Sequence, residues 1–192
     1  MLHQIQALDT ELFLFFNAIH APWADSLMHT ATQKLTWLPL YAWLLYWLFK
    51  TAKPGQLKSV VWQIAMIVVA VALADQAASA VLKPLIGRLR PCHVLYLADR
   101  IHLVGSCGGA YGFVSSHAST TFAVATGFVL IFKNNPTFKW LFLWAAFVSY
   151  SRVYVGVHYP FDVVGGAVVG IGSAYVVWGL VQRLGFVDFR NL

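Results

Sequence analysis

A histidine and an aspartate four residues apart follow an apolar stretch, in the segment Ser-Arg-Val-Tyr-Val-Gly-Val-His-Tyr-Pro-Phe-Asp at 151–162. Pro160 favours the first turn of a helix, where its missing N–H costs nothing, and Asp162 falls in that same turn. The spacing allows the Asp162 carboxylate to hold one imidazole nitrogen of His158, which fixes the tautomer and leaves a lone pair on the other nitrogen. His158 is therefore a candidate nucleophile.

Cationic side chains from distant parts of the sequence are expected on the same side of the predicted helices. Lys83, Arg90 and Arg152 together would form a pocket with roughly three positive charges, where desolvation strengthens the attraction for an anion. Arginine suits such a pocket because its planar fork binds two phosphate oxygens at once. The predicted ligand is a phosphate group.

A second anion-binding feature is predicted where a helix begins near His117. The hydroxyls of Ser115 and Ser116 precede that helix, and the free backbone N–H groups of its first turn attract anions. His117 would protonate the departing oxygen after His158 attacks phosphorus, and would then activate the water that hydrolyses the phosphohistidine. No metal or other cofactor is expected, because the cations of the protein would stabilise the phosphoryl charge.

Several polar residues have a structural interpretation when each is taken alone. Arg and Lys at a membrane boundary usually anchor a helix there, and this interpretation is favoured for Arg88 and Arg100. Asp75 lies inside an apolar stretch and is expected to pack against a polar neighbour, whereas His93 and His102 are expected to be solvated in a connection. The coincidence of three cationic segments, two histidines and one carboxylate on one predicted side favours a catalytic site.

The composition is that of an integral membrane protein. Of the 192 residues, 59% are hydrophobic and only 10% charged, and the mean hydropathy is +0.68, which excludes an ordinary soluble domain. The net charge of +6 comes from basic residues scattered between apolar runs, so nucleic acid is not an expected partner. An all-α membrane helical bundle is predicted, with the lipid bilayer around it and no obligate protein partner evident.

Five apolar stretches are predicted to span the membrane, at 35–49, 59–82, 117–132, 138–155 and 163–181. Residues 1–33 form an amphipathic segment that is expected to lie at the interface or to dip part-way into it, so five to six transmembrane helices are expected. The connection 83–116 is predicted to be a long loop outside the cytoplasm. One domain over 1–192 is expected, because no internal repeat is present.

The basic residues predict the orientation. One side of the predicted helices receives Lys50, Lys53, Lys58, Lys133, Lys139, Arg183 and Arg190, and the other receives Lys34, Lys83, Arg88, Arg90, Arg100 and Arg152. When the three cations expected in the site are set aside, seven basic residues remain on the first side and three on the second. This asymmetry places the short basic loops of the first side in the cytoplasm. The candidate site would then face away from the cytoplasm.

The two cysteines of the chain, Cys92 and Cys107, lie in the same connection. A disulfide between them would suit an oxidising compartment, and two free thiols are the alternative. Both alternatives stay open at the level of sequence.

The motifs resemble the type 2 phosphatidic acid phosphatase (PAP2) superfamily, whose signature is Lys-x6-Arg-Pro, Pro-Ser-Gly-His and Ser-Arg-x5-His-x3-Asp. Residues 83–91 match the first motif in full and residues 151–162 match the third in full. The middle motif departs, because 114–117 read Val-Ser-Ser-His, with the proline lost and Ser116 in place of glycine. The motifs follow the family's order.

The resemblance implies a helical-bundle phosphatase and gives each matching residue a role. It implies a catalytic set of nucleophile, supporting carboxylate and general acid: His158, Asp162 and His117. It implies a phosphate-binding set of Lys83, Arg90, Ser115 and Arg152, with Ser116 and Ser151 carried over less directly. Bacterial members of this size are commonly inner-membrane phosphatases of undecaprenyl diphosphate, phosphatidylglycerophosphate, phosphatidic acid or lipid A, which enter sideways from the bilayer at its periplasmic boundary.

Two other functions stay open. A metal-dependent membrane hydrolase would use His117, His158 and Asp162 as ligands, but the metal would have to enter a cationic pocket and no HExxH-type pair is present. A transporter or binding protein for phosphorylated lipids would need the cations but not a nucleophile, and the sequence shows no inverted repeat.

Overall fold

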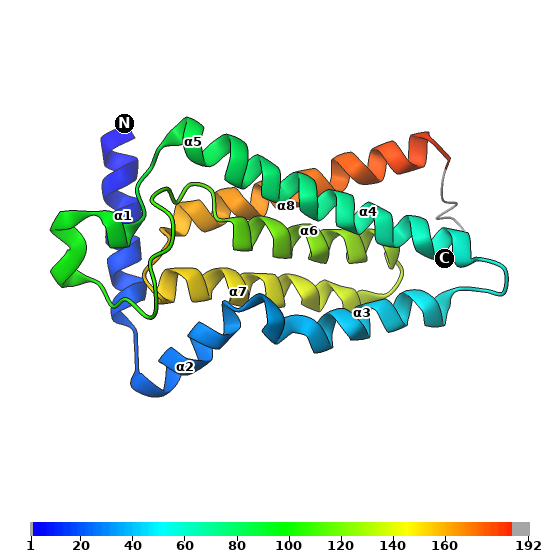
Figure 1. The fold of residues 1–192 in the computed structure, drawn as a ribbon, viewed down its shortest axis with the longest axis horizontal. Coiled ribbons are helices and arrows are strands. Elements are labelled where there is room, and N and C mark those ends of the chain that lie inside the picture. Colours follow the sequence, from blue (N-terminus) through cyan, green and yellow to red (C-terminus); the bar gives the residue numbers. More distant parts are fainter. Residues whose placement is uncertain (1, 186–192) are drawn as a thin grey trace.

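The computed structural model describes residues 2–185, and within that range its regular elements are all helices, with no strand (Figure 1). The α-helices are α1 (Leu2–Ala18), α2 (Pro22–Ala31), α3 (Leu38–Thr51), α4 (Leu57–Gln76), α5 (Lys83–Ile86), α6 (Ser116–Ile131), α7 (Leu141–Tyr154) and α8 (Pro160–Arg183). Short turns of 3-10 or π-helix are η1 (Lys34–Trp37), η2 (Ala77–Leu82), η3 (Pro91–His93), η4 (Leu95–Arg100) and η5 (Pro136–Trp140). Arg190, one of the residues used to predict orientation, lies outside the described residues.

Each of the five predicted apolar stretches forms a helix, but one boundary differs from the prediction in a way that affects the site. Helix α4 continues through the π-helical η2 into α5, so Lys83 lies on a helix and not in a loop. Helix α8 begins at Pro160, as the proline indicated. Two helices, Leu57–Ile86 and Pro160–Arg183, are long and apolar enough to cross a membrane by length and composition. The expected number of five to six spans stays a prediction.

The bundle is packed most closely between α6 and α8. A Cβ atom at Gly166 would lie 2.5 Å from the carbonyl oxygen of Ser115, and one at Gly170 would collide with the carbonyl oxygen of Ser119. Glycine at these two positions allows the backbones to approach in a way that no larger residue permits. The approach brings the start of α6, which carries the second motif, against the first turns of α8.

One end of the bundle carries α1, α2 and the connection from 87 to 115 (Figure 1). Helix α1 crosses this end and packs there through Phe13, which is buried with Leu97 and Tyr159. The turn between α3 and α4, the connection between α6 and α7, and the end of α8 lie at the opposite end. The first of these is called the loop end below, and the second the turn end.

Asn17 fixes α1 to the loop end. Its side-chain amide donates hydrogen bonds to the carbonyl oxygens of His102, Val153 and Tyr154 at 2.9, 3.3 and 2.7 Å, and its amide oxygen accepts from the His102 N–H at 2.7 Å. A fully buried asparagine with its polar groups satisfied specifies one docking position. The interfacial location of this segment stays a prediction.

The 87–115 connection is folded against the bundle and not extended into solvent. It contains η3 and η4 and is closed by a disulfide between Cys92 and Cys107, whose Cα atoms lie 6.0 Å apart. Of the two alternatives that the sequence left open, the structure therefore contains the disulfide and not two free thiols.

Candidate active site

The candidate nucleophile lies in the short connection between α7 and α8. The Nδ1 atom of His158 is 3.2 Å from Oδ2 of Asp162, and the two side chains are 2% and 0% exposed. The same Oδ2 accepts the backbone N–H of Tyr159 at 3.1 Å, so the carboxylate also caps the start of α8. With a proton on Nδ1 directed to the carboxylate, the lone pair of His158 is on Nε2.

The surroundings of His158 keep its imidazole neutral. Burial lowers the pKa of His158 well below its ordinary value of 6.5, and the positive charges of Arg90, Arg152, Lys83 and Arg88 lower it further. A neutral imidazole is the form that attacks an electrophile. His158 is therefore a neutral imidazole at neutral pH.

Lys83 and Ser116 approach each other from helices that are remote in sequence. The Nζ atom of Lys83 donates to the Ser116 hydroxyl at 2.8 Å. Lys83 also interacts electrostatically with Arg90 and Arg152, so the cations of the first and third motifs lie in one region. Like charges gathered in this way favour an anionic ligand, because each raises the positive potential at the others.

Two polar atoms in this region are buried without a hydrogen-bond partner among residues 2–185: the hydroxyl of Ser115 and Nε of Arg152. Ser115 is fully buried, and its backbone N–H donates to the carbonyl oxygen of Asp162 at 2.9 Å. An unsatisfied buried polar atom is costly, and the exceptions in folded proteins call for an explanation. A phosphate group bound beside these two residues would supply acceptor oxygens to both.

Arg90 is held by the disulfide-closed connection. Its Nη1 donates to the carbonyl oxygen of Cys107 at 2.8 Å and its Nε donates to the carbonyl oxygen of Tyr111 at 3.2 Å. A Cβ atom at Gly112 would lie 2.8 Å from Oδ2 of Asp162 and 3.4 Å from Cγ of Arg90. The connection thus orients Arg90 and closes against the Asp162 carboxylate.

His117, the candidate general acid, is oriented by the N-terminal segment. Its Nε2 lies 3.1 Å from the carbonyl oxygen of Thr32, a distance at which an Nε2–H donates to that oxygen and leaves Nδ1 for proton exchange. His117 interacts electrostatically with His158 and Arg152. The structure therefore gathers the predicted site residues of all three motifs at the loop end.

Comparison with known proteins decides the family. The sequence model of the PAP2 superfamily matches residues 60–186. The chain belongs to the PAP2 superfamily. It is 38% identical over 191 residues to a lipid A 4'-phosphatase of Bacteroides thetaiotaomicron, with 96% of this chain and 81% of that protein covered. It is 30% identical over 167 residues to an undecaprenyl-diphosphatase of Sulfolobus acidocaldarius, with 84% and 73% covered.

The fold of this PAP2 protein is also that of a solved relative. The crystal structure of Aquifex aeolicus LpxE superposes with a TM-score of 0.69 at 26% sequence identity, covering 90% of this chain and 95% of that one. Taken with the named relatives, the match identifies the chain as a lipid phosphatase of the PAP2 superfamily.

Two interpretations drawn from the sequence of this PAP2 protein are wrong. Arg88 is not an interfacial anchor, because its side chain is 18% exposed and bonds Asp9 at 2.7 Å and Asp162 at 3.0 Å. His102 is not simply solvated either, since its Nε2 lies 2.8 Å from Asp25. Arg88 was visible in the sequence as a third basic residue inside the first motif, beside Lys83 and Arg90, but nothing in the sequence indicated its partners.

Two further residues, Ser151 inside the third PAP2 motif and His93 shortly after the first, have local hydrogen-bond partners. The Ser151 hydroxyl is buried and donates to the carbonyl oxygen of Val148 at 2.7 Å, one turn earlier in α7. His93 is exposed, with its Nε2 at 3.2 Å from the carbonyl oxygen of Gly108. Both residues serve local structure in this conformation.

Proposed function

We propose that this protein is a metal-independent phosphatase that removes phosphate from a lipid phosphate or diphosphate through a phosphohistidine. The observation that carries the proposal is the buried pair of His158 and Asp162 beside three cationic side chains and two unpaired buried polar atoms. Binding alone would need the cations, whereas a neutral imidazole held by a carboxylate is the arrangement of a nucleophile.

In the first step, Nε2 of His158 attacks phosphorus while the bond from phosphorus to the lipid oxygen breaks. His117 enters this step as the imidazolium, with its Nε2–H on the Thr32 carbonyl oxygen, and gives its Nδ1 proton to the leaving oxygen, which leaves it neutral. Asp162 stabilises the imidazole of His158 as positive charge develops there. Lys83, Arg90 and Arg152 offset the charge on the non-bridging phosphoryl oxygens. The products are the dephosphorylated lipid and His158 phosphorylated on Nε2.

In the second step, water attacks the phosphohistidine. His117 now takes a proton from the water, the N–P bond breaks, and its electron pair returns to Nε2 of His158 as inorganic phosphate leaves. The cationic lining of Lys83, Arg90 and Arg152 supports a scheme without metal, because these charges would repel a divalent cation. Both carboxylate oxygens of Asp162 are engaged by protein groups.

For the location, we propose a multi-pass protein of a bacterial inner membrane with the loop end at the periplasmic boundary. The bonded cysteines Cys92 and Cys107 support this side, because disulfides persist in oxidising compartments. The proposed substrate is a phosphorylated lipid A, with undecaprenyl diphosphate as the next choice, in accordance with the names of the relatives at 38% and 30% identity.

The proposed function is tested by phosphate release from a panel of lipids by the purified protein in detergent. The panel contains lipid A, undecaprenyl diphosphate, phosphatidylglycerophosphate and phosphatidic acid, each with and without excess EDTA. We expect the highest kcat/KM with lipid A and no effect of EDTA. Absence of release from every lipid, or loss in EDTA that added metal restores, would contradict the proposal.

The covalent step is tested by acid–base analysis of the trapped enzyme. Substrate with radiolabelled phosphate should leave a protein-bound label that is stable to base and labile to acid, as a phosphoramidate is. His158→Ala should lose both this label and phosphate release, by on the order of 10³-fold or more. His3→Ala, which changes an exposed histidine of α1, is the matched control; a label that survives in His158→Ala would exclude the scheme.

A further inference from the structure

Two charged residues without a role in the three motifs, Arg88 and Asp9, form a chain of ion pairs from Asp162 to α1. From this geometry we infer that Arg88 and Asp9 are positioning residues of the phosphatase: Asp9 holds Arg88, and Arg88 holds Asp162 in the orientation that serves His158. The inference rests on the proposed function, because it concerns the step in which His158 attacks phosphorus.

The Asp162 carboxylate is bonded through both of its oxygens. Oδ1 accepts from Nη1 of Arg88 at 3.0 Å, while Oδ2 accepts from the Tyr159 N–H at 3.1 Å and lies 3.2 Å from Nδ1 of His158. A carboxylate fixed on both sides cannot rotate about its Cβ–Cγ bond without losing a charged hydrogen bond. Arg88 therefore determines which oxygen His158 meets and at what angle.

Arg88 is itself held from two directions. Its Nη1 lies 2.7 Å from Oδ2 of Asp9, and its guanidinium carbon lies 3.9 Å from the centre of the Tyr159 ring, within the range of a cation–π contact. The arginines of the phosphate pocket have other contacts: Arg90 bonds loop carbonyls, and Nε of Arg152 has no protein partner within residues 2–185. Arg88 thus serves the carboxylate, while Arg90 and Arg152 are left to serve the phosphate.

Asp9 connects α1 to the start of α8. It is fully buried, and its Oδ1 accepts the backbone N–H of Phe161 at 2.9 Å, across a separation of 152 residues. Phe161 directly precedes Asp162, so the same aspartate fixes both the guanidinium and the backbone beside the catalytic carboxylate. Asp9 and Asp162 thus pair with the Arg88 guanidinium from two helices, α1 and α8.

The alternative is an ion pair that merely ties α1 to the bundle. Such a tie would change stability and leave the turnover of the folded enzyme unaltered. A positioning role predicts a different result. Replacing Arg88 should lower kcat and leave the affinity for phosphate unchanged, and the conservative replacement by lysine should recover part of the loss. The effects of replacing Arg88 and Asp9 should also be coupled in the double variant.

The experiment compares Arg88→Gln, Arg88→Lys, Asp9→Asn and the double variant Asp9→Asn/Arg88→Gln with the wild type. For each folded variant, kcat, KM and the inhibition constant for inorganic phosphate are measured in detergent with the lipid that the wild type hydrolyses. Arg100→Gln and Glu11→Gln, which change exposed residues of η4 and α1, are the matched controls and should behave as wild type.

We expect Arg88→Gln to lower kcat about 10- to 100-fold, the usual range for residues that orient an active group, with the phosphate inhibition constant changed less than about threefold. Arg88→Lys should recover part of the loss, because an ammonium keeps the charge without the fork. Asp9→Asn should lower kcat by less, about 3- to 10-fold, and the double variant should match Arg88→Gln, since Asp9 acts through Arg88.

The inference is overturned if Arg88→Gln keeps the wild-type kcat, if the phosphate inhibition constant rises while kcat stays, or if the two losses multiply in the double variant. If Arg88→Gln does not fold, the inference is tested with Arg88→Lys and Asp9→Asn. A wild-type kcat in both of these variants would overturn it. Failure of the proposed function is a separate outcome, because there the wild type itself releases no phosphate and forms no phosphohistidine.

Discussion

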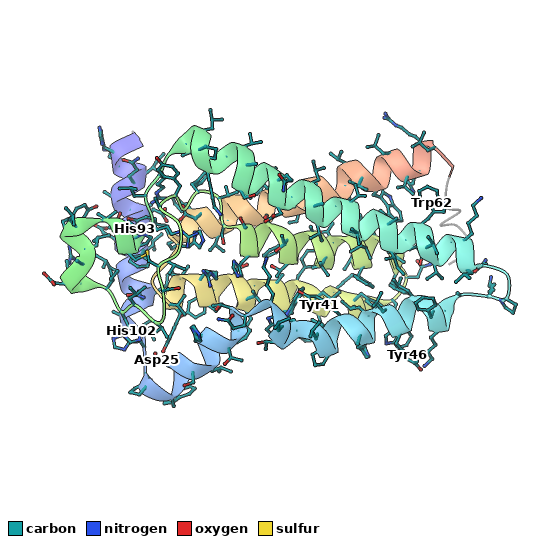
Figure 2. The ribbon with its side chains drawn as sticks, in the orientation of Figure 1. Asp25, Tyr41, Tyr46, Trp62, His93 and His102 are labelled. Carbon is teal, nitrogen blue, oxygen red and sulfur yellow. A yellow bond between two sulfur atoms is a disulfide. The ribbon has the colours of Figure 1, made fainter. Side chains whose placement is uncertain are left out.

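The loop end of the bundle combines apolar packing with charged and polar contacts, whereas the turn end is held mainly by apolar and aromatic packing. The ion pairs within residues 2–185 all lie at the loop end and involve Arg88, His102 or His158. In Figure 2, Asp25, His93 and His102 lie at that end, and Tyr46 and Trp62 lie toward the other. The two ends therefore differ in what specifies their structure.

At the turn end, large side chains fill the space between helices. Phe138 is buried and stacks on Phe132 with ring centres 4.1 Å apart, and Trp47 packs edge-on against Phe138. Cores of this kind tolerate replacement by another apolar residue of similar volume. At the loop end each buried polar atom needs a particular partner at a particular distance, so substitutions there should affect chemistry more than stability.

The largest effect is expected for Asp162→Asn. The amide keeps the shape of the carboxylate but presents a donor that conflicts with Arg88 or with Nδ1 of His158, so the wrong tautomer is favoured. We expect kcat to fall about 10²- to 10⁴-fold with KM changed less than about threefold. Steady-state kinetics beside Asp99→Asn, an exposed control, measures this, and a loss confined to KM would disprove the orienting role.

Opening the disulfide should have the next largest effect. Cys92→Ser/Cys107→Ser frees the Cys107 carbonyl that holds Arg90, so KM should rise about tenfold while kcat stays within about threefold. Closing a loop of this length contributes about 3 kcal/mol in the chain-entropy model, so the melting temperature should also fall. A reducing agent should reproduce both effects in the wild type and have no effect on the double variant. An unchanged KM would show that the disulfide does not influence substrate binding through Arg90.

The pH dependence of stability should reveal the buried neutral histidine. Because the pKa of folded His158 lies well below 6.5, the unfolded chain takes up a proton below pH 6.5 that the folded protein does not. Stability should then decrease with falling pH by up to about 1.4 kcal/mol per pH unit from this group alone, and be unaffected above that pH.

His158→Asn removes that titration and is the comparison for it. Melting temperatures of the wild type and the variant in detergent, taken from pH 5 to pH 8, should run parallel above pH 6.5 and diverge below it. Parallel curves over the whole range would show that His158 binds its proton equally in the folded and unfolded states.

The smallest effect on activity is expected at the turn end. Phe138→Leu removes ring contacts but keeps an apolar side chain, so the free energy of unfolding should fall by about 1 kcal/mol. Phosphate release by the folded variant should remain within about twofold of wild type. A loss of tenfold or more would show that packing at the turn end controls the geometry of the loop end, and the contrast between the two ends would fail.

The sequence by itself determined the features that depend on local geometry. The spacing of His158 and Asp162, with Pro160 between them, placed a carboxylate in the first turn of a helix within reach of the imidazole, because four residues leave the backbone few alternatives. The long apolar runs likewise located the helices.

Tertiary structure alone decided the contacts between parts of the chain that are far apart. The continuation of α4 to Ile86, which places Lys83 on a helix, the pairing of Asp9 with Arg88 and the contact of Thr32 with His117 have no local signature. The two contacts arise because α1 and α2 pack across the loop end, and a buried polar group there meets whichever partner that packing brings within hydrogen-bond distance.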